Sequence, residues 1–396
     1  MTAIDGRNRR RWTTAIFAFV GVTAVGFQMR GALLPSLRDT FTVSPTLLGF
    51  VATAGTLGFM LAVLATGMIA GRIDVTRILF GSVAVVSVAI FAMGLAPIFP
   101  IYLATLFVRG VATGPFRALD RAVLSHLYPD SRARIFNLYA LVWAVGAALG
   151  PLVVTGSLAL GDWRYAYLAL GCLLAPVAVL VYRLDAPSAV GTERVLTVEE
   201  LRAVLRKPAI SGMVATLVLS GGVEGSLFTW LPYFAASYLH IDDANLVLTT
   251  FLIAYVPARL FYSIVVERFR YSLDLVVVLA ILGVPILWML VTRVSGSGVF
   301  LVAFCLGFVV SGIFPTLSAF GVEAAPEYSG PVNALSTAAS YTGIAVVPPV
   351  VGFLAERSDI QQALRLLPVL LLVFIVLAVV TRLRLDDAVS ATVSES

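Results

Sequence analysis

The chain has 396 residues, of which 60% are hydrophobic and only 12% are charged. Soluble domains are about 45–50% apolar and about 25% charged, so this composition excludes a soluble globular protein and predicts an all-α membrane protein. The formal net charge of +5 would suit a nucleic-acid partner. Most Lys and Arg residues instead flank apolar runs on one side of the predicted membrane, so we expect no nucleic-acid binding.

Apolar runs long enough to cross a bilayer predict twelve transmembrane helices in two six-helix bundles. The first six are expected near 12–37, 45–70, 78–97, 100–128, 135–160 and 164–183. The second six are expected near 209–239, 245–267, 272–292, 298–322, 332–355 and 362–382. Lys and Arg are most frequent in the segments that precede the odd-numbered spans, which predicts a multi-pass protein of the cell (inner) membrane with both termini cytoplasmic.

The sequence shows no sign of a cofactor or a metal. Cys172 and Cys305 fall inside predicted spans and lack metal-site spacing. No glycine loop followed by Lys is present to bind the phosphates of ATP. We therefore expect no enzymatic activity, and the expected partners are a small-molecule substrate and membrane lipids, with the protein a monomer.

The first span carries an arginine near its outer end, in "VGFQMRGALLPSL" at 25–37. A guanidinium inside a span costs at least ~2.5 kcal/mol and usually faces a water-filled interior. Arg30 is therefore expected to face a central cavity. Two interpretations stay open: an ion pair that holds the first and fourth spans together, or a binding group for a carboxylate, phosphate or hydroxyl-rich solute.

The fourth span contains four charged residues in "VRGVATGPFRALDRAVLSH", 108–126. At about 100° per residue, Asp120 lies about 20° from Arg109, and the other two lie roughly 80° and 120° away. All four fit on one broad face that points to the interior. Arg109 and Arg117 are candidates for substrate binding, and Asp120 and Arg121 for coupling or gating.

The polar stretch 184–208 divides the spans six and six. Within it, "TVEELRAVLRK" predicts a short amphipathic helix on the inner membrane surface. The domains are therefore expected at 1–183 for the first bundle, 184–208 for a cytoplasmic linker and 209–383 for the second bundle, with a cytoplasmic tail over 384–396.

Two charged residues lie near mid-depth in the seventh and eighth spans, Glu224 and Arg259. They fit either a structural ion pair or a proton-coupling pair, because a carboxylate in low dielectric beside a cation can change its protonation state. The aromatic residues nearby could stack on a solute or pack helices. We assign three of them to the candidate substrate site: Trp230, Tyr233 and Tyr341.

The two halves match each other when the sequence is shifted by 197 residues. Gly110 then falls on Gly307 and Gly146 on Gly343. Several matches at one offset, at equivalent places in six-span halves, indicate an internal repeat. Transporters built from two such repeats bind their solute near the midplane and rock one half against the other. The charges break the symmetry, since Arg30 falls on Leu227.

Several loops and spans resemble motifs found in membrane transporters. The stretch "GMIAGRIDVTR", 67–77, has the Gly and Arg positions of a signature loop between the second and third spans, and "SIVVERFRYSL", 263–273, repeats an acidic–Arg pair. The stretch "GAALGP", 146–151, resembles the core of the fifth-span motif of proton-coupled exporters, and its other interpretation is close helix packing. The residues concerned are Gly67, Arg72, Asp74 and Arg77 in the first loop, Glu267 and Arg268 in its repeat, and Gly146, Gly150 and Pro151 in the fifth span.

On these motifs the chain resembles the major facilitator superfamily over nearly its whole length. "GGVEGSLFTWLPYF", 221–234, and "YVPARLFYSIVVERF", 255–269, are most similar to the fucose/galactose/glucose–proton symporter-like members. The resemblance implies alternating access, with the two loops acting as conformational switches. It also implies that Glu224 matches an acidic residue of those symporters. One departure is that their acidic residue before "LLP" is absent here, where the chain reads "RGALLP".

The resulting hypothesis is a secondary active transporter that moves a small polar solute, sugar-like or an organic anion, and is driven by protons. A proton-driven exporter of lipophilic neutral or acidic compounds is the alternative. A lipid flippase or a transporter-like sensor is a further alternative.

Overall fold

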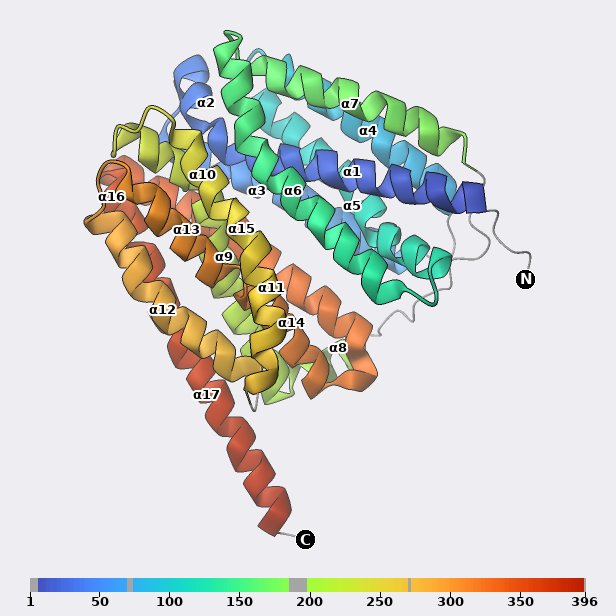
Figure 1. The fold of residues 1–396 in the computed structure, drawn as a ribbon, viewed down its shortest axis with the longest axis vertical. Helices are drawn as coiled ribbons and strands as arrows, with labels where there is room; N and C mark the ends of the chain where they lie inside the picture. Colours follow the sequence, from blue (N-terminus) through green and yellow to red (C-terminus); the bar gives the residue numbers. More distant parts are fainter. Residues whose placement is uncertain (1–5, 70–73, 185–197, 270–271, 395–396) are drawn as a thin grey trace. The chain divides into compact units, whose positions relative to one another are not determined.

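The computed structural model describes residues 6–69, 74–184, 198–269 and 272–394, and these are almost entirely helical (Figure 1). The chain forms two compact units, Met1–Val195 and Leu196–Ser396. Each unit is described separately below as unit 1 and unit 2.

Unit 1 contains one helix for each of the six predicted spans, plus one short helix. Its helices are α1 (Gly6–Ala32), α2 (Leu34–Phe41), α3 (Pro45–Ile69), α4 (Val75–Gly94), α5 (Phe99–Leu127), α6 (Arg132–Ala159) and α7 (Arg164–Tyr182). The α4 helix begins where the Asp74 carboxylate accepts a hydrogen bond from the Arg77 backbone, as an N-cap should. Figure 1 shows α1 alongside α6 and α7, which are its main neighbours.

Unit 2 contains the other six spans, several of them broken into two helices. Its elements are α8 (Val198–Leu205), α9 (Pro208–Ser237), α10 (Ala244–Ile253), α11 (Tyr255–Val265), α12 (Ser272–Thr292), α13 (Gly298–Val310), α14 (Ile313–Ala324), α15 (Ser329–Arg357), α16 (Ile360–Leu364) and α17 (Leu366–Ser394), with 3₁₀ turns at Val266–Arg268 and Pro326–Tyr328. The α8 helix lies in the predicted amphipathic segment. Residues 185–197 of the predicted linker are outside the described residues.

The breaks inside the spans have a common cause. The helix is interrupted at Leu33, Ala254 and Arg365, and again between α13 and α14. A proline follows each break within four residues, at Pro35, Pro257, Pro368 and Pro315 respectively. Proline has no N–H to donate to the carbonyl four residues earlier and its ring clashes there, which kinks or ends a helix.

Eleven helices or helix pairs among the described residues are long and apolar enough to cross a membrane. The α5 helix is not among these eleven although it has 29 residues. It contains Arg109, Arg117, Asp120 and Arg121, the charges that the sequence placed in the fourth span. With α5 the chain has the twelve helices of the predicted fold, so the all-α membrane fold with two six-helix bundles is confirmed. The α17 helix continues to Ser394 and so includes most of the segment 384–396 that the sequence analysis assigned to a tail.

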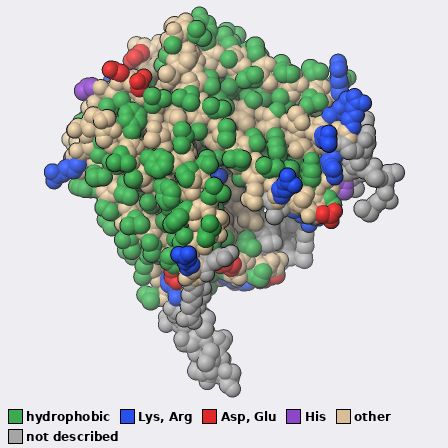
Figure 2. All heavy atoms as spheres, in the orientation of Figure 1, with side chains coloured by type: hydrophobic (Ala, Val, Ile, Leu, Met, Phe, Trp, Pro, Cys, Tyr) green, Lys and Arg blue, Asp and Glu red, His purple; other side chains and the backbone are tan. Residues whose placement is uncertain are grey.

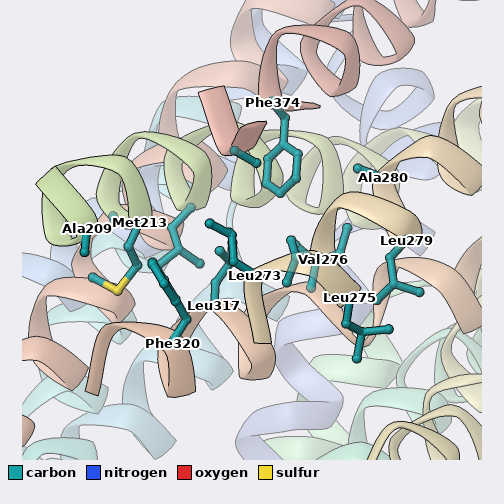
Figure 3. Close-up of a cluster of buried hydrophobic side chains, with 14 of the residues drawn as sticks. Ala209, Met213, Leu273, Leu275, Val276, Leu279, Ala280, Leu317, Phe320 and Phe374 are labelled. Carbon is teal, nitrogen blue, oxygen red and sulfur yellow. The ribbon is translucent and has the colours of Figure 1, made fainter. Parts of the chain in front are cut away.

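Apolar side chains cover much of the outer surface as well as the interior. Figure 2 shows hydrophobic side chains over most of the drawn face, and Val88, Leu260 and Leu301 are each at least two-thirds exposed. In water such a surface would aggregate, whereas in a bilayer the lipid covers it. In unit 2 a buried cluster joins α9, α12, α14 and α17, and Figure 3 shows Met213, Leu279, Leu317 and Phe374 within it.

The helices pair in the same way in the two units, which confirms the internal repeat. The first span packs on the fifth, the second on the fourth and the third on the sixth, and the corresponding spans of unit 2 pair likewise. A side chain on Gly110 would overlap the carbonyl of Gly55, and one on Gly307 would overlap the carbonyl of Phe251. In the same way Gly146 approaches the Gly21 carbonyl and Gly343 the Val218 carbonyl. Residues equivalent by the 197-residue offset thus allow equivalent close approaches of two backbones.

These close approaches lead to a stability prediction. The change Gly110→Ala should destabilise the protein by about 1–3 kcal/mol, because the new methyl group meets backbone rather than a movable side chain. Gly81 in α4 is the matched control, since nothing lies within 4 Å of the position its side chain would take. Gly81→Ala should be neutral or slightly stabilising. Thermal unfolding of both variants in detergent tests the difference, and equal melting temperatures would contradict it.

Candidate functional site

Unit 1 buries two arginines and two tyrosines in one cluster, which we call the guanidinium cluster: Arg30, Tyr102, Arg109 and Tyr167. Arg30 and Arg109 are each 6% exposed and both tyrosines are fully buried. The hydroxyls of Tyr102 and Tyr167 lie 2.7 Å apart. Both arginines are close enough to act electrostatically on both tyrosines. The first, fourth and sixth spans therefore bring two positive charges to one tyrosine pair.

Neighbouring glycines make room for both guanidinium groups. A side chain at Gly26 would lie 3.2 Å from Nη2 of Arg109, and one at Gly55 would lie 3.2 Å from Nη1 of Arg30. The Arg109 Nη2 donates to the carbonyl of Thr23 at 3.2 Å. The Nε of Arg109 is buried and has no acceptor among the described residues.

Arg30 also contacts the main chain of two helices. Its Nε donates to the Phe27 carbonyl at 3.0 Å, and its Nη1 to the Ala52 carbonyl of α3 at 3.5 Å. Its guanidinium carbon lies 3.9 Å from the centre of the Phe27 ring. These contacts fix the head group, so a structural role for Arg30 stays an alternative to solute binding.

Aromatic rings pack against the tyrosine pair and tie α2 to the cluster. The Trp163 ring makes edge contacts with Tyr102 and Tyr167, and its indole N–H donates to the Thr40 hydroxyl at 3.0 Å. Phe41 on α2 contacts the rings of Tyr102 and Trp163. This packing excludes water from one side of the guanidinium cluster.

The other charges of α5 form a second cluster, of Arg117, Asp120, Arg121 and Tyr139. Asp120 is fully buried, accepts a hydrogen bond from the Tyr139 hydroxyl and lies 3.8 Å from Nη1 of Arg117. Both arginines lie over the Tyr139 ring. Arg121 is exposed, and the Oδ1 atom of Asp120 has no partner among the described residues. Asp120 is thus occupied within α5 and α6 rather than beside Arg109, eleven residues or about 16 Å away along the helix.

In unit 2 the candidate coupling residues meet at α9 and α11. The Tyr255 hydroxyl donates to Oε1 of Glu224 at 2.6 Å. The Arg259 guanidinium carbon lies 5.6 Å from the centre of the Tyr255 ring, and its charge acts on Glu224. We call Glu224, Tyr255 and Arg259 the coupling cluster.

The three aromatic candidates of the second half also lie in unit 2. The Trp230 ring is fully buried, its N–H donates to the Pro348 carbonyl at 3.0 Å, and the Tyr233 ring packs edge-on against it. These contacts join α9 to α15. Tyr341 is half-buried on α15.

The switch-loop residues are only partly described. Asp74 caps α4 and pairs with Arg77 at 3.2 Å on the surface, where such a pair contributes little. Arg72 lies outside the described residues. The surroundings of Gly67 and the side chain of Glu267 are not described either. Arg268 ends the 3₁₀ turn after α11 and is exposed.

Unit 2 also contains an ion pair before α9 that sequence reasoning did not predict. Lys207 Nζ lies 2.6 Å from Oε1 of Glu327 in the turn before α15, and this hydrogen bond lowers the pKa of the exposed Glu327 carboxyl.

Four tyrosines of these clusters were also missed, because tyrosine is common in membrane proteins and carries no motif: Tyr102, Tyr139, Tyr167 and Tyr255. One signal was available. Tyr102 lies seven residues before Arg109, which places both on one face of the same helix, about 20° apart.

Two six-span units, each with charged side chains buried among apolar helices, define a polytopic membrane transporter. The family model for the Major Facilitator Superfamily matches residues 16–245 and 238–395. The chain therefore belongs to the major facilitator superfamily, whose members transport small solutes.

Similar proteins agree with this assignment. The Protein TsgA homolog of Edwardsiella ictaluri (strain 93-146) is 22% identical over 391 residues, covering 96% of this chain and 98% of the relative. The 2-nitroimidazole transporter of Escherichia coli (strain K12) is 26% identical over 243 residues, 60% of each chain. A crystal structure of a mutant of the nucleoside transporter NupG superposes with a TM-score of 0.80 at 10% identity, covering 94% of this chain and 99% of that one. The last likeness concerns the fold alone.

Proposed function

We propose that the protein is a proton-coupled secondary transporter of a small polar solute, sugar-like or an organic anion, that works by alternating access. The observation that carries the proposal is the Glu224–Tyr255 hydrogen bond of 2.6 Å beside Arg259. A carboxylate held among apolar helices is costly to keep charged. Such a group can therefore take up a proton, and a nearby cation favours its release. The relative named as a 2-nitroimidazole transporter supports a solute of small size.

In this proposal the two units have different tasks. The guanidinium cluster of unit 1 contacts the solute, with Arg117 as a further candidate contact. The coupling cluster of unit 2 carries the proton. We further propose that the protein is a monomer of the cell (inner) membrane, that both termini are cytoplasmic, and that the loop residues around Asp74 and Arg268 change partners during transport.

Proton coupling is tested with purified protein in liposomes that contain a trapped pH-sensitive dye. Candidate solutes are added outside without an imposed pH gradient. We expect a transported solute to acidify the lumen, because protons enter with it. Solute entry without any change of luminal pH would contradict coupling, and alkalinisation would indicate proton exchange, the mode of an exporter. Empty liposomes and a protonophore are the controls.

A further inference from the structure

The charge of Arg109 is not neutralised by a carboxylate in the described part of unit 1. Among the described membrane-spanning helices of unit 1, Asp120 is the only carboxylate. It is about 16 Å along α5 from Arg109. It accepts a hydrogen bond from Tyr139 and pairs with Arg117. Arg109 has no ion pair among the described residues. Its guanidinium donates one hydrogen bond there, to the main-chain carbonyl of Thr23.

Polar atoms with unused hydrogen-bonding capacity line the same helices. The Nε of Arg109 is a buried donor without an acceptor. On α1, Gln28 is 1% exposed, and neither its amide nitrogen nor its amide oxygen has a partner in the described part of the chain. On α3, the hydroxyl of Thr56, next to Gly55, also has none. Gln28 faces α6, where its Cβ lies close to Gly150, so the orphan donor that belongs to the guanidinium cluster is the Nε of Arg109. Buried polar groups are normally satisfied, and a ligand would supply the acceptor that this donor lacks.

The chemistry of these groups selects a class of ligand. A guanidinium offers planar, forked donors that match the two oxygens of a carboxylate, and tyrosine hydroxyls donate to the same oxygens. A negative charge placed there would also offset the repulsion between two guanidinium groups at low dielectric. A neutral sugar would satisfy hydrogen bonds and leave the Arg109 charge without an anionic partner.

We infer that the guanidinium cluster binds the oxyanion group of the transported solute, so that the substrate class is a small organic anion. This inference rests on the proposed transport function and narrows its substrate from a polar solute to an anionic one. Arg109 and Arg30 bind the oxyanion from α5 and α1, and the Tyr102–Tyr167 pair borders it. Gly26 and Gly55 keep the space in which the two head groups sit.

The test is thermal unfolding of the full-length protein in detergent with matched probes: formate, acetate, benzoate and inorganic phosphate, and the neutral amides formamide, acetamide and benzamide. A ligand that binds only the folded state raises the melting temperature. We expect at least one anion to stabilise the protein while its neutral analogue does not. In Arg109→Gln the apparent Kd for that anion should weaken by roughly tenfold or more, the loss of one charged hydrogen bond.

Two variants control this test. Arg132 is an exposed arginine at the start of α6, and Arg132→Gln should bind the anion like the parent. Arg109→Lys keeps a positive charge and covers the case in which Arg109→Gln does not fold, and it should retain part of the anion selectivity. Equal stabilisation by an anion and its amide, or anion binding that survives Arg109→Gln, overturns the inference. Either result leaves the transport function standing with a neutral solute, whereas absence of both solute entry and proton movement in liposomes would remove the function itself.

Discussion

Replacing Glu224 by Gln is expected to abolish proton-driven accumulation of the solute while its equilibration across the membrane continues. Gln has nearly the shape of a protonated glutamate, and its amide can still accept the hydrogen bond that the Tyr255 hydroxyl donates at 2.6 Å. It cannot release a proton. The variant should therefore move solute in both directions without coupling the movement to the pH gradient.

The size of the effect follows from the energy in the gradient. One pH unit is worth about 1.4 kcal/mol per proton, or about tenfold accumulation of solute for one proton per cycle. The parent protein should approach that ratio in liposomes with an imposed gradient of one unit. Glu224→Gln should level off at a ratio near one. Radiolabelled solute uptake to steady state, followed by counterflow exchange, separates lost coupling from lost transport.

Two controls make this test specific. Glu323 on α14 also accepts a hydrogen bond from a side-chain hydroxyl, that of Ser272 at 2.9 Å, and Glu323→Gln should accumulate solute normally. Tyr255→Phe keeps the Glu224 carboxylate and removes its donor, so accumulation should persist at an altered rate. If Glu224→Gln still concentrates solute against its gradient, another group carries the proton, and the buried carboxylate of Asp120 is the next candidate.

The sequence predicted the twelve spans because each is a long apolar run, and it predicted α5 to within a residue or two even though that helix carries four charges. Those charges fall on one helical face, which the 3.6-residue period reveals without any partner being known. The internal repeat was also readable, since glycines at one offset mark the places where two backbones meet.

What the sequence could not predict were the partners of the buried charges. Asp120 and Arg109 share a face of α5, and face alone suggests that they are neighbours. In the structure they are about 16 Å apart along the helix axis, and Asp120 accepts a hydrogen bond from the Tyr139 hydroxyl on α6 instead. Likewise Tyr167 and Tyr255 come from helices whose side-by-side packing no single-helix pattern encodes. The helix breaks were in principle readable from the prolines, but prolines also occur within unbroken helices here, such as Pro115 and Pro151.

Replacing Arg30 by Ala is expected to reduce transport at low solute concentration by roughly a hundredfold or more. The estimate follows from losing two charged hydrogen bonds to the solute, each worth about 1.5–3 kcal/mol, at about 1.4 kcal/mol for each factor of ten. Initial uptake rates in liposomes, divided by the amount of folded protein inserted, give the measurement. Arg30→Lys should fall between the parent and Arg30→Ala, because an ammonium keeps the charge and loses the fork.

The same variant tests whether Arg30 is structural. Its hydrogen bond to the Ala52 carbonyl joins α1 to α3, so a purely structural role predicts a lower melting temperature with normal uptake per folded molecule. A solute-binding role predicts lost uptake whatever the melting temperature does. If folded Arg30→Ala transports at the full rate, the guanidinium cluster is part of the scaffold and the anionic substrate class fails with it. Coupling through Glu224 would be untouched by that result, because the two clusters lie in different units and share no residue.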